Sequence, residues 1–253
     1  MAIIRPEQRI HRYEFKYWIE PHMKQRLLAY LLNFMQYDPN NADGEPYKIC
    51  SLYLDTRDLT CYYEKYNGDM QRRKYRIRAY NDDYSNVVFE IKAKNNIYIQ
   101  KFREFHSLGD QDFTLLPDML NSGDPDFQGP FSHACRVLGL APVCWVAYRR
   151  TALTGRNNPK LRVTFDEGLS GTPADSYRLR HMEAQSVFLS HWRRPLIMEI
   201  KFDYYLPHWL ERCINWLERC IKELNLSHES ISKYGFGINR FHFNYWPERQ
   251  WTH

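Results

Sequence analysis

The chain has 253 residues, of which 43% are hydrophobic, enough to build the core of one large domain. No apolar run approaches the length of about 18 residues that a membrane-spanning helix needs. The first residues include Arg5, Arg9 and Arg12 and lack the apolar centre of a signal peptide. A formal net charge of +5 favours anionic partners without selecting one. We therefore expect one cytoplasmic domain, 1–253, with no direct membrane insertion.

The cysteines give no sign of a metal site or a disulfide. None of the 6 belongs to a CxxC pair. Cys213 and Cys220 share a strongly helical segment, where seven residues of helical rise, about 10 Å, separate them too far for a disulfide. We expect reduced and mostly buried thiols, in agreement with a cytoplasmic location.

Short segments rich in Tyr, Phe, Val and Ile recur along the chain and are bounded by turn residues, which predicts strands. They lie at 12–19, 49–55, 71–81, 86–94, 97–105, 144–153, 161–167 and 196–204. Helical patterns interrupt them. Pro21 opens a helix that is predicted to run to about residue 36, because proline favours the first helical turn. A looser helical insertion is predicted at 110–140.

The clearest helix is predicted at 207–224. Its apolar residues recur every three or four positions and its charged residues lie off that stripe, which is typical of a helix that covers one side of a sheet. The stripe consists of Leu206, Leu210, Cys213, Ile214, Leu217, Ile221 and Leu224. Many strands with a few covering helices predict an α+β fold, compatible with a closed or nearly closed antiparallel barrel.

The strand at 71–81 has one apolar face and one strongly basic face. Alternate residues of a strand point to opposite sides, so Tyr75, Ile77 and Ala79 share one face. The other face carries Arg72, Lys74, Arg76 and Arg78. Like charges about 7 Å apart repel one another, so this face requires a compensating partner.

Four further strands repeat the division into an apolar and a charged face. Their charged faces contain Glu14 and Lys16; Glu90, Lys92 and Lys94; Arg162, Thr164 and Asp166; and Glu199 and Lys201. Together with the basic strand, these faces hold a larger excess of bases over acids than the chain as a whole. Two interpretations remain open: a charged sheet face that meets water, or charged faces that line the inside of a barrel.

The residue types favour the second interpretation. Guanidinium groups match pairs of phosphate oxygens, and isolated acids among many bases suit a divalent cation shared between carboxylate and phosphate. No phosphate-binding glycine loop, zinc helix, hydrolase elbow or kinase motif is present, and the histidines show no ligand spacing. Because the bases alternate into strand faces and form no surface patch, we expect no nucleic-acid partner.

Eight segments occur together in a recognisable order. They are RYEFKYWI at 12–19, SLYLDT at 51–56, YRIR at 75–78, FEIK at 89–92, YRRTA at 148–152, LRVTFD at 161–166, MEIK at 198–201 and SKY at 232–234. From about residue 10 to 240 the chain thus resembles the VTC domain, the polyphosphate polymerase branch of the triphosphate tunnel metalloenzymes in the CYTH-like superfamily. The resemblance implies a closed antiparallel β-barrel, a basic tunnel, with helices packed outside.

The resemblance also implies an activity and its residues. The family transfers the γ-phosphate of ATP onto inorganic polyphosphate and releases ADP, with Mn²⁺ favoured and Mg²⁺ as the substitute. Pyrophosphate or phosphate are further expected ligands. Residues with expected catalytic roles are Arg76, Arg78, Arg150, Arg162 and Lys92. Expected substrate contacts are Lys16, Lys101, Arg103, Lys201 and Lys233, to which the basic strand face adds Lys74. Glu199 matches the metal-binding carboxylate, and Glu14, Glu90 and Asp166 are additional metal candidates.

The chain departs from the wider superfamily at one position. Members often begin with an ExExK motif, whereas Arg12, Glu14 and Lys16 occupy the corresponding face here. The loss of the first carboxylate favours a polymerase, but a triphosphate or polyphosphate hydrolase and a non-catalytic polyphosphate-binding module both stay open. The phosphate-sensing domain and membrane helices of eukaryotic members have no counterpart in this sequence, so delivery across a membrane would need a separate membrane partner.

Overall fold

The computed structural model describes residues 5–9, 12–41, 43–96, 98–108, 120, 125–174, 186–189, 196–223 and 231–243. Its strands are β1 (Arg5–Arg9), β2 (Arg12–Ile19), β3 (Met35–Tyr37), β4 (Tyr47–Asp55), β5 (Gln71–Tyr80), β6 (Asp83–Asn95), β7 (Tyr98–Ser107), β8 (Ala141–Gly155), β9 (Arg162–Pro173), β10 (Val187–Phe188) and β11 (Leu196–Asp203). Its helices are α1 (Pro21–Leu31), α2 (Thr60–Tyr66), α4 (Pro130–Leu138), α6 (His208–Glu223) and α7 (Lys233–Phe241), with short 3-10 turns η1 (Pro39–Asn41) and η3 (Pro125–Phe127).

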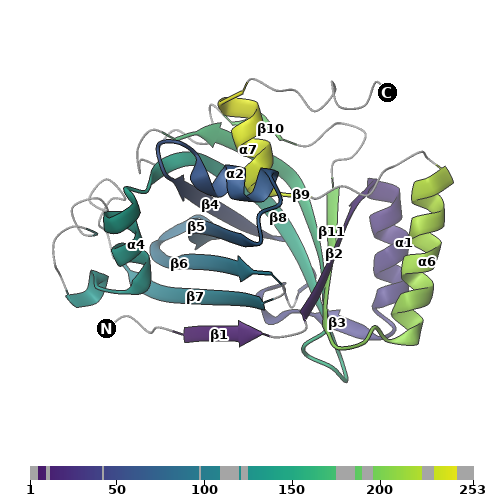
Figure 1. Ribbon diagram of the computed structural model, residues 1–253. Coiled ribbons are helices and arrows are strands. Elements are labelled where there is room, and N and C mark those ends of the chain that lie inside the picture. The colour runs from purple at the N-terminus through teal and green to yellow at the C-terminus, as the bar shows by residue number, and fades with distance from the viewer. Residues whose placement is uncertain are drawn as a thin grey trace.

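The strands form one antiparallel sheet, which curls around its own inner face (Figure 1). Its order is β1-β7-β6-β5-β4-β8-β9-β11-β2, with β3 beside β8 and β10 beside β9. Between the two end strands, β1 and β2, the described residues form no ladder. Side chains bridge the curled sheet instead, since Lys92 of β6 lies 3.3 Å from the carboxylate of Glu14 on β2. The prediction of an α+β fold is confirmed. The sheet curls into a tunnel-like shape, but its end strands β1 and β2 are not hydrogen-bonded to each other in the described residues.

Every predicted strand is present. β8 and β9 run further than predicted because they pair with each other over most of their length, from Thr154 opposite Arg162 to Cys144 opposite Pro173. The short strands β1, β3 and β10 were not predicted, since two to five residues carry too little alternation to be recognised.

The helix predictions need two corrections. α1 ends at Leu31 and not near residue 36, because residues 35–37 form β3 and pair with 153–155 of β8. The insertion at 110–140 is confirmed only at its C-terminal end by α4, while 109–119 and 121–124 lie outside the described residues. α6 confirms the predicted helix at 207–224 up to Glu223, and Leu224 lies outside the description.

Two apolar clusters cover the outer face of the sheet. α1 and α6 lie side by side over β2, β11 and β9 (Figure 1), where Leu27 and Leu217 meet Phe165 and Met198. α4 covers β5 and β6, where Phe131 contacts Phe89 with ring centroids 4.9 Å apart. Burial of large apolar side chains is the main force that holds these helices to the sheet. The charged faces of the same strands are thereby turned inward.

α7 corrects the expectation that all helices lie outside. Tyr234 and Ile238 of α7 belong to a buried cluster with Tyr53, Val146 and Ile197, on the same side of the sheet as the charged residues. The Tyr234 hydroxyl donates a hydrogen bond to the buried carboxylate of Asp55, at the end of β4. α7 therefore covers one part of the inner face, and its first residues lie among the charged side chains there.

Substitution of Gly237 by alanine should loosen this helix. A Cβ at this position would lie 2.7 Å from Cys144 Sγ, well inside van der Waals contact. We expect Gly237→Ala to lower the free energy of unfolding by about 1–3 kcal/mol, as overpacking does. Urea unfolding measures the change. The double variant with Cys144→Ala removes the clashing sulfur and should recover part of the loss; a double variant as unstable as the sum of the single ones would contradict this account.

The described cysteine side chains agree with the prediction of free thiols. Cys50, Cys61, Cys135, Cys144 and Cys213 are all reduced and buried. Within the ranges that the structure describes, no helix has the length and apolar character to span a membrane.

Candidate functional site

The inner face of β5, β6 and β7 is organised around one carboxylate, Glu90. Its side chain is buried, and its oxygens lie 2.5 Å from Arg76, 3.6 Å from Arg78, 2.9 Å from Lys101 and 3.0 Å from Arg103. Burial alone would raise the pKa of Glu90, but Arg76, Arg78 and Lys101 hold it well below its usual value. The cluster therefore has a net positive charge, since three arginines surround the one carboxylate.

The surroundings of Lys101 in this cluster lower its pKa, and this shift provides a pH-dependent test. Burial, with Arg76, Arg103 and Arg78 nearby, lowers the pKa of Lys101 to about 6 although Glu90 opposes the shift. Lys101 is then mostly neutral near pH 8, and a bound phosphate chain raises its pKa again. Tripolyphosphate binding should take up a proton at about pH 8 and tighten as the pH falls toward 6.

Calorimetry in buffers of different ionisation enthalpy measures this proton uptake. Lys101→Arg keeps the positive charge but has a guanidinium that stays protonated, so its uptake should be smaller than that of the unmodified protein. Equal uptake by both proteins would assign the proton to another group.

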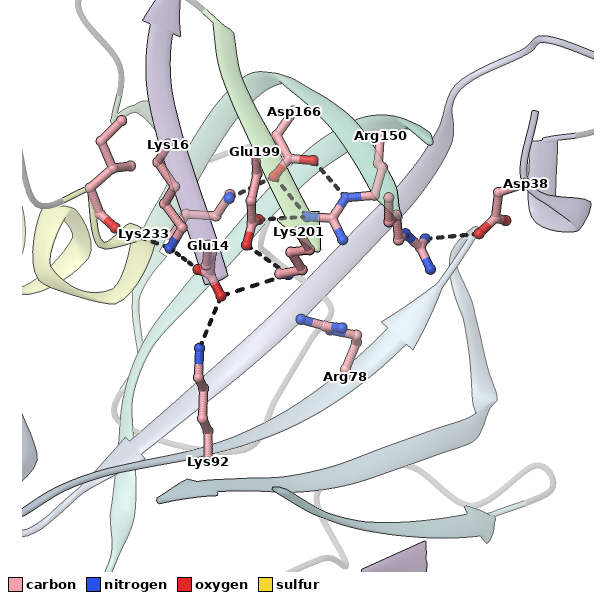
Figure 2. A network of polar contacts seen from close by, with 12 residues as sticks. Glu14, Lys16, Asp38, Arg78, Lys92, Arg150, Asp166, Glu199, Lys201 and Lys233 are labelled. Carbon is pink, nitrogen blue, oxygen red and sulfur yellow. Dashed lines mark hydrogen bonds and ion pairs between the residues drawn. The ribbon is translucent and has the colours of Figure 1, made fainter. Parts of the chain in front are cut away.

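A second cluster joins β8, β9, β11 and α7 (Figure 2). Arg150 donates two hydrogen bonds to the fully buried Asp166, of 2.6 and 2.8 Å, and Lys233 of α7 lies 2.6 Å from the same carboxylate. Glu199 lies 2.6 Å from Lys201 and 3.9 Å from Arg150. Burial opposes ionisation of Asp166, yet Arg150 and Lys233 lower its pKa to about 2. Each acid of this cluster is thus ionised and held by cations at neutral pH.

Glu14 extends the second cluster toward β6. Its carboxylate lies 2.7 Å from Lys16, 3.3 Å from Lys92 and 4.0 Å from Lys201. Burial and the neighbouring charge of Glu199 raise the pKa of Glu14, but the three lysines lower it below its usual value. Two carboxylates, Glu14 and Glu199, therefore lie close enough to repel each other while lysines surround them (Figure 2).

Three residues that sequence reasoning missed hold predicted cations in place. Asp38, which is buried, lies 2.9 Å from Arg162, and the Tyr47 hydroxyl accepts a hydrogen bond of 3.2 Å from the same guanidinium. The Tyr148 ring lies under both Arg150 and Lys233, at 5.2 and 4.8 Å from its centroid. Cation–π contact of this kind orients both charges. Asp38 follows a strand too short to predict, so no sequence signal marked it.

A pocket of about 410 Å³ opens where β2 faces β5 and β6. It is lined by the predicted Glu14, Lys16, Lys74 and Lys92 and by bases that no prediction named as site residues: Lys65, Arg72 and Lys94. Lys16 donates to the carbonyl of Ile231, and Lys74 donates to the Ser232 hydroxyl, both just before α7. The pocket is strongly cationic, and burial together with Lys16 and Lys92 keeps the pKa of Lys74 well below its usual value.

The predicted site residues thus gather on one inner face. The predicted bases on this face are Lys16, Lys74, Arg76, Arg78, Lys92, Lys101, Arg103, Arg150, Arg162, Lys201 and Lys233, and the predicted acids are Glu14, Glu90, Asp166 and Glu199. Most of them belong to the Glu90 cluster or to the second cluster, around Glu199, Asp166 and Glu14, whereas Arg162 pairs with Asp38 and Lys74 with Ser232. The interpretation of a charged face that simply meets water is wrong, because Arg78, Glu90, Arg150, Asp166 and Glu199 are buried.

The carboxylates fit a divalent cation only in company with phosphate. Among the described residues, no group of three or more His, Cys, Asp and Glu side chains could hold a metal by itself. Mg²⁺ and similar ions are often held by one or two carboxylates plus substrate phosphates, and the neighbouring Glu14 and Glu199 provide that number. Asp166 is bound by Arg150 and Lys233, and Glu90 is surrounded by cations, just as lysines hold Glu14 and Glu199.

Known proteins resemble this chain over most of its length. A family model described as the VTC domain matches residues 11–242. No curated protein matches the chain. Among solved structures, a "putative adenylate cyclase" from Bacillus halodurans is 16% identical, with a TM-score of 0.49 over 92% of this chain and 98% of that one. A "putative adenylyl cyclase" from Hippeastrum, described as having a dominant triphosphatase activity, is 14% identical, with a TM-score of 0.49 over 94% and 97% of the two chains.

The family match confirms the resemblance drawn from the eight ordered segments and has nearly the same limits. It also agrees with the basic strand faces, which the alternation of residues predicted without the family resemblance. A fold of the triphosphate tunnel metalloenzyme type implies a divalent metal. Because the family model covers nearly the whole sequence, this chain belongs to the VTC domain family.

Proposed function

We propose that this protein is a polyphosphate polymerase that transfers the γ-phosphate of ATP onto inorganic polyphosphate. The observation that carries the proposal is the excess of cations, most of them partly buried, on one inner face around the ionised carboxylates Glu14, Glu90, Asp166 and Glu199. Like charges in such an excess repel one another, and a bound polyanion relieves that repulsion; a chain of phosphates carries the charge and length to do so.

The arginines account for the binding of the transferred group. Arg76 and Arg78 on β5 and Arg150 and Arg162 on β8 and β9 present guanidinium groups from neighbouring parts of the inner face. Planar guanidinium forks bind pairs of phosphate oxygens, and phosphoryl transfer depends mainly on position and charge neutralisation. We assign these four arginines to the β- and γ-phosphates of ATP.

The lysines account for the acceptor and the leaving group. Lys16, Lys74 and Lys92 line the cationic pocket, and Lys201 and Lys233 lie beside Glu199 and Asp166. We assign the pocket to the acceptor chain. Lys101 and Arg103 supply further contacts from β7.

The reaction needs no general base from the protein. A terminal oxygen of the acceptor chain, already ionised at neutral pH, forms a bond to the γ-phosphorus while the bond between that phosphorus and the β–γ bridging oxygen breaks. ADP leaves with that oxygen, and the chain grows by one phosphate. Glu199 would hold a divalent cation, Mn²⁺ in this proposal with Mg²⁺ as the substitute, which would supply positive charge to the phosphate oxygens.

Incubation with ATP and Mn²⁺, followed by a gel stained for polyphosphate, tests the proposal. A ladder of long product is the expected result. Free orthophosphate from ATP or tripolyphosphate without a ladder would instead identify a hydrolase, the alternative that the neighbouring acids Glu14 and Glu199 favour. Binding of polyphosphate with no consumption of ATP would identify a non-catalytic module. The separate membrane partner and the use of pyrophosphate or phosphate belong to the same proposal.

A further inference from the structure

The hydroxyl of Thr164 is buried on the inner face without a hydrogen-bond partner among the described residues. Its residue is 2% exposed, and Oγ1 is one of the few buried side-chain atoms there with nothing to bind. Valine has the same shape and no hydroxyl, so an unpaired threonine at this place costs stability that valine would not. A ligand that binds at this face can supply the missing acceptor.

The position of Thr164 points to that use. β9 places Thr164 between Arg162 and Asp166 on the inner face, because the flanking Val163 and Phe165 belong to the outer core. In the ladder between β9 and β11, Thr164 lies directly opposite Glu199. On its other side it faces Ala152 of β8, which has no polar side-chain group.

The surroundings favour an anionic partner. Arg162, Lys201 and Arg150 lie on the same strands within two residues of this position or of its cross-strand neighbours. The carboxylate of the facing residue, Glu199, is already held by Lys201 and Arg150. A hydroxyl among cations can donate its hydrogen to an oxygen that those cations attract.

We propose that Thr164 Oγ1 donates a hydrogen bond to a phosphate oxygen of the ligand bound beside Glu199. Thr164 is then a substrate-binding residue that the family resemblance did not supply. The proposal rests on the proposed function in one respect, since it takes a phosphate chain as the ligand. It predicts an unusual combination: loss of the hydroxyl should stabilise the ligand-free protein and weaken ligand binding.

Thermal unfolding and calorimetric titration with tripolyphosphate, in EDTA and then with Mn²⁺, test the combination. Thr164→Val should raise the Tm of the ligand-free protein by about 2–4 °C. It should also raise the Kd for tripolyphosphate about tenfold in both conditions, as expected for a hydrogen bond to a charged group. Thr164→Ser, which keeps a hydroxyl, should bind much more tightly than Thr164→Val.

Ser132→Ala is the matched control. Ser132 is fully buried on α4, and its hydroxyl also lacks a partner among the described residues, but it lies on the outer side of the sheet. Removal of the Ser132 hydroxyl should leave the Kd for tripolyphosphate unchanged.

The outcomes separate this inference from the proposed function. If the unmodified protein does not bind tripolyphosphate in either condition, the proposed function fails. If it binds and Thr164→Val binds equally well, or is less stable without ligand, the inference about Thr164 is overturned. A weaker affinity confined to Mn²⁺ would overturn the phosphate contact and assign the hydroxyl to water on the cation.

Discussion

Replacing Glu199 by glutamine should lower kcat/KM for ATP about 100-fold or more, while the fold is retained. Glutamine has the same shape but lacks the charge that would hold a divalent cation, and loss of one electrostatic contact in a transition state typically has this effect. Glu199 is also the acid that faces Thr164 and lies between Lys201 and Arg150. Steady-state assays over a range of Mn²⁺ concentrations measure the change.

The dependence on metal distinguishes a ligand from a merely structural acid. If Glu199 holds the cation, the variant should need a higher Mn²⁺ concentration for half-maximal rate as well as having a lower maximal rate. Glu211→Gln, on the exposed side of α6, is the control and should leave both quantities unchanged. Activity of Glu199→Gln close to that of the unmodified protein would remove Glu199 from the metal site.

Replacing Glu90 by glutamine should destabilise the ligand-free protein by about 3–5 kcal/mol, the usual cost when a buried ion pair loses one partner. The carboxylate is 2% exposed and lies near Arg76, Arg78, Lys101 and Arg103, which would then repel one another without a counter-charge. Urea unfolding measures the loss.

Added tripolyphosphate should restore part of that stability, because an anion that binds only the folded protein shifts the folding equilibrium. It should stabilise Glu90→Gln more than Glu211→Gln, the same exposed control. A Glu90→Gln variant as stable as the unmodified protein would show that the four cations do not depend on this acid.

The pH dependence of stability follows from the same acids. The folded-state pKa of Glu90 lies well below 4.5 and that of Asp166 is about 2, against an ordinary value of 3.8. Their stabilising contribution is therefore fully present above pH 4.5 and is lost as the pH falls through their folded-state values. Glu90→Gln should show a shallower loss of stability at low pH than the unmodified protein.

The sequence predicted the site best where the alternation of residues along a strand decides which side chains share a face. The period of two in 71–81 placed Lys74, Arg76 and Arg78 on one face, and the structure confirms that face. Recurring apolar residues likewise identified α6 and the side it covers. Both patterns are local, because the backbone geometry of a single element fixes which residues share a face.

The sequence alone therefore determined which charged residues share one face of each strand, and the eight ordered segments pointed to the family. Tertiary structure decided which charges meet. Glu90 joins cations from β5 and β7, Asp166 joins Arg150 of β8 to Lys233 of α7, and Asp38 reaches Arg162 from a turn after β3. Strand order, the curl of the sheet and the inward position of α7 depend on contacts between distant segments, and no local period in the sequence encodes them.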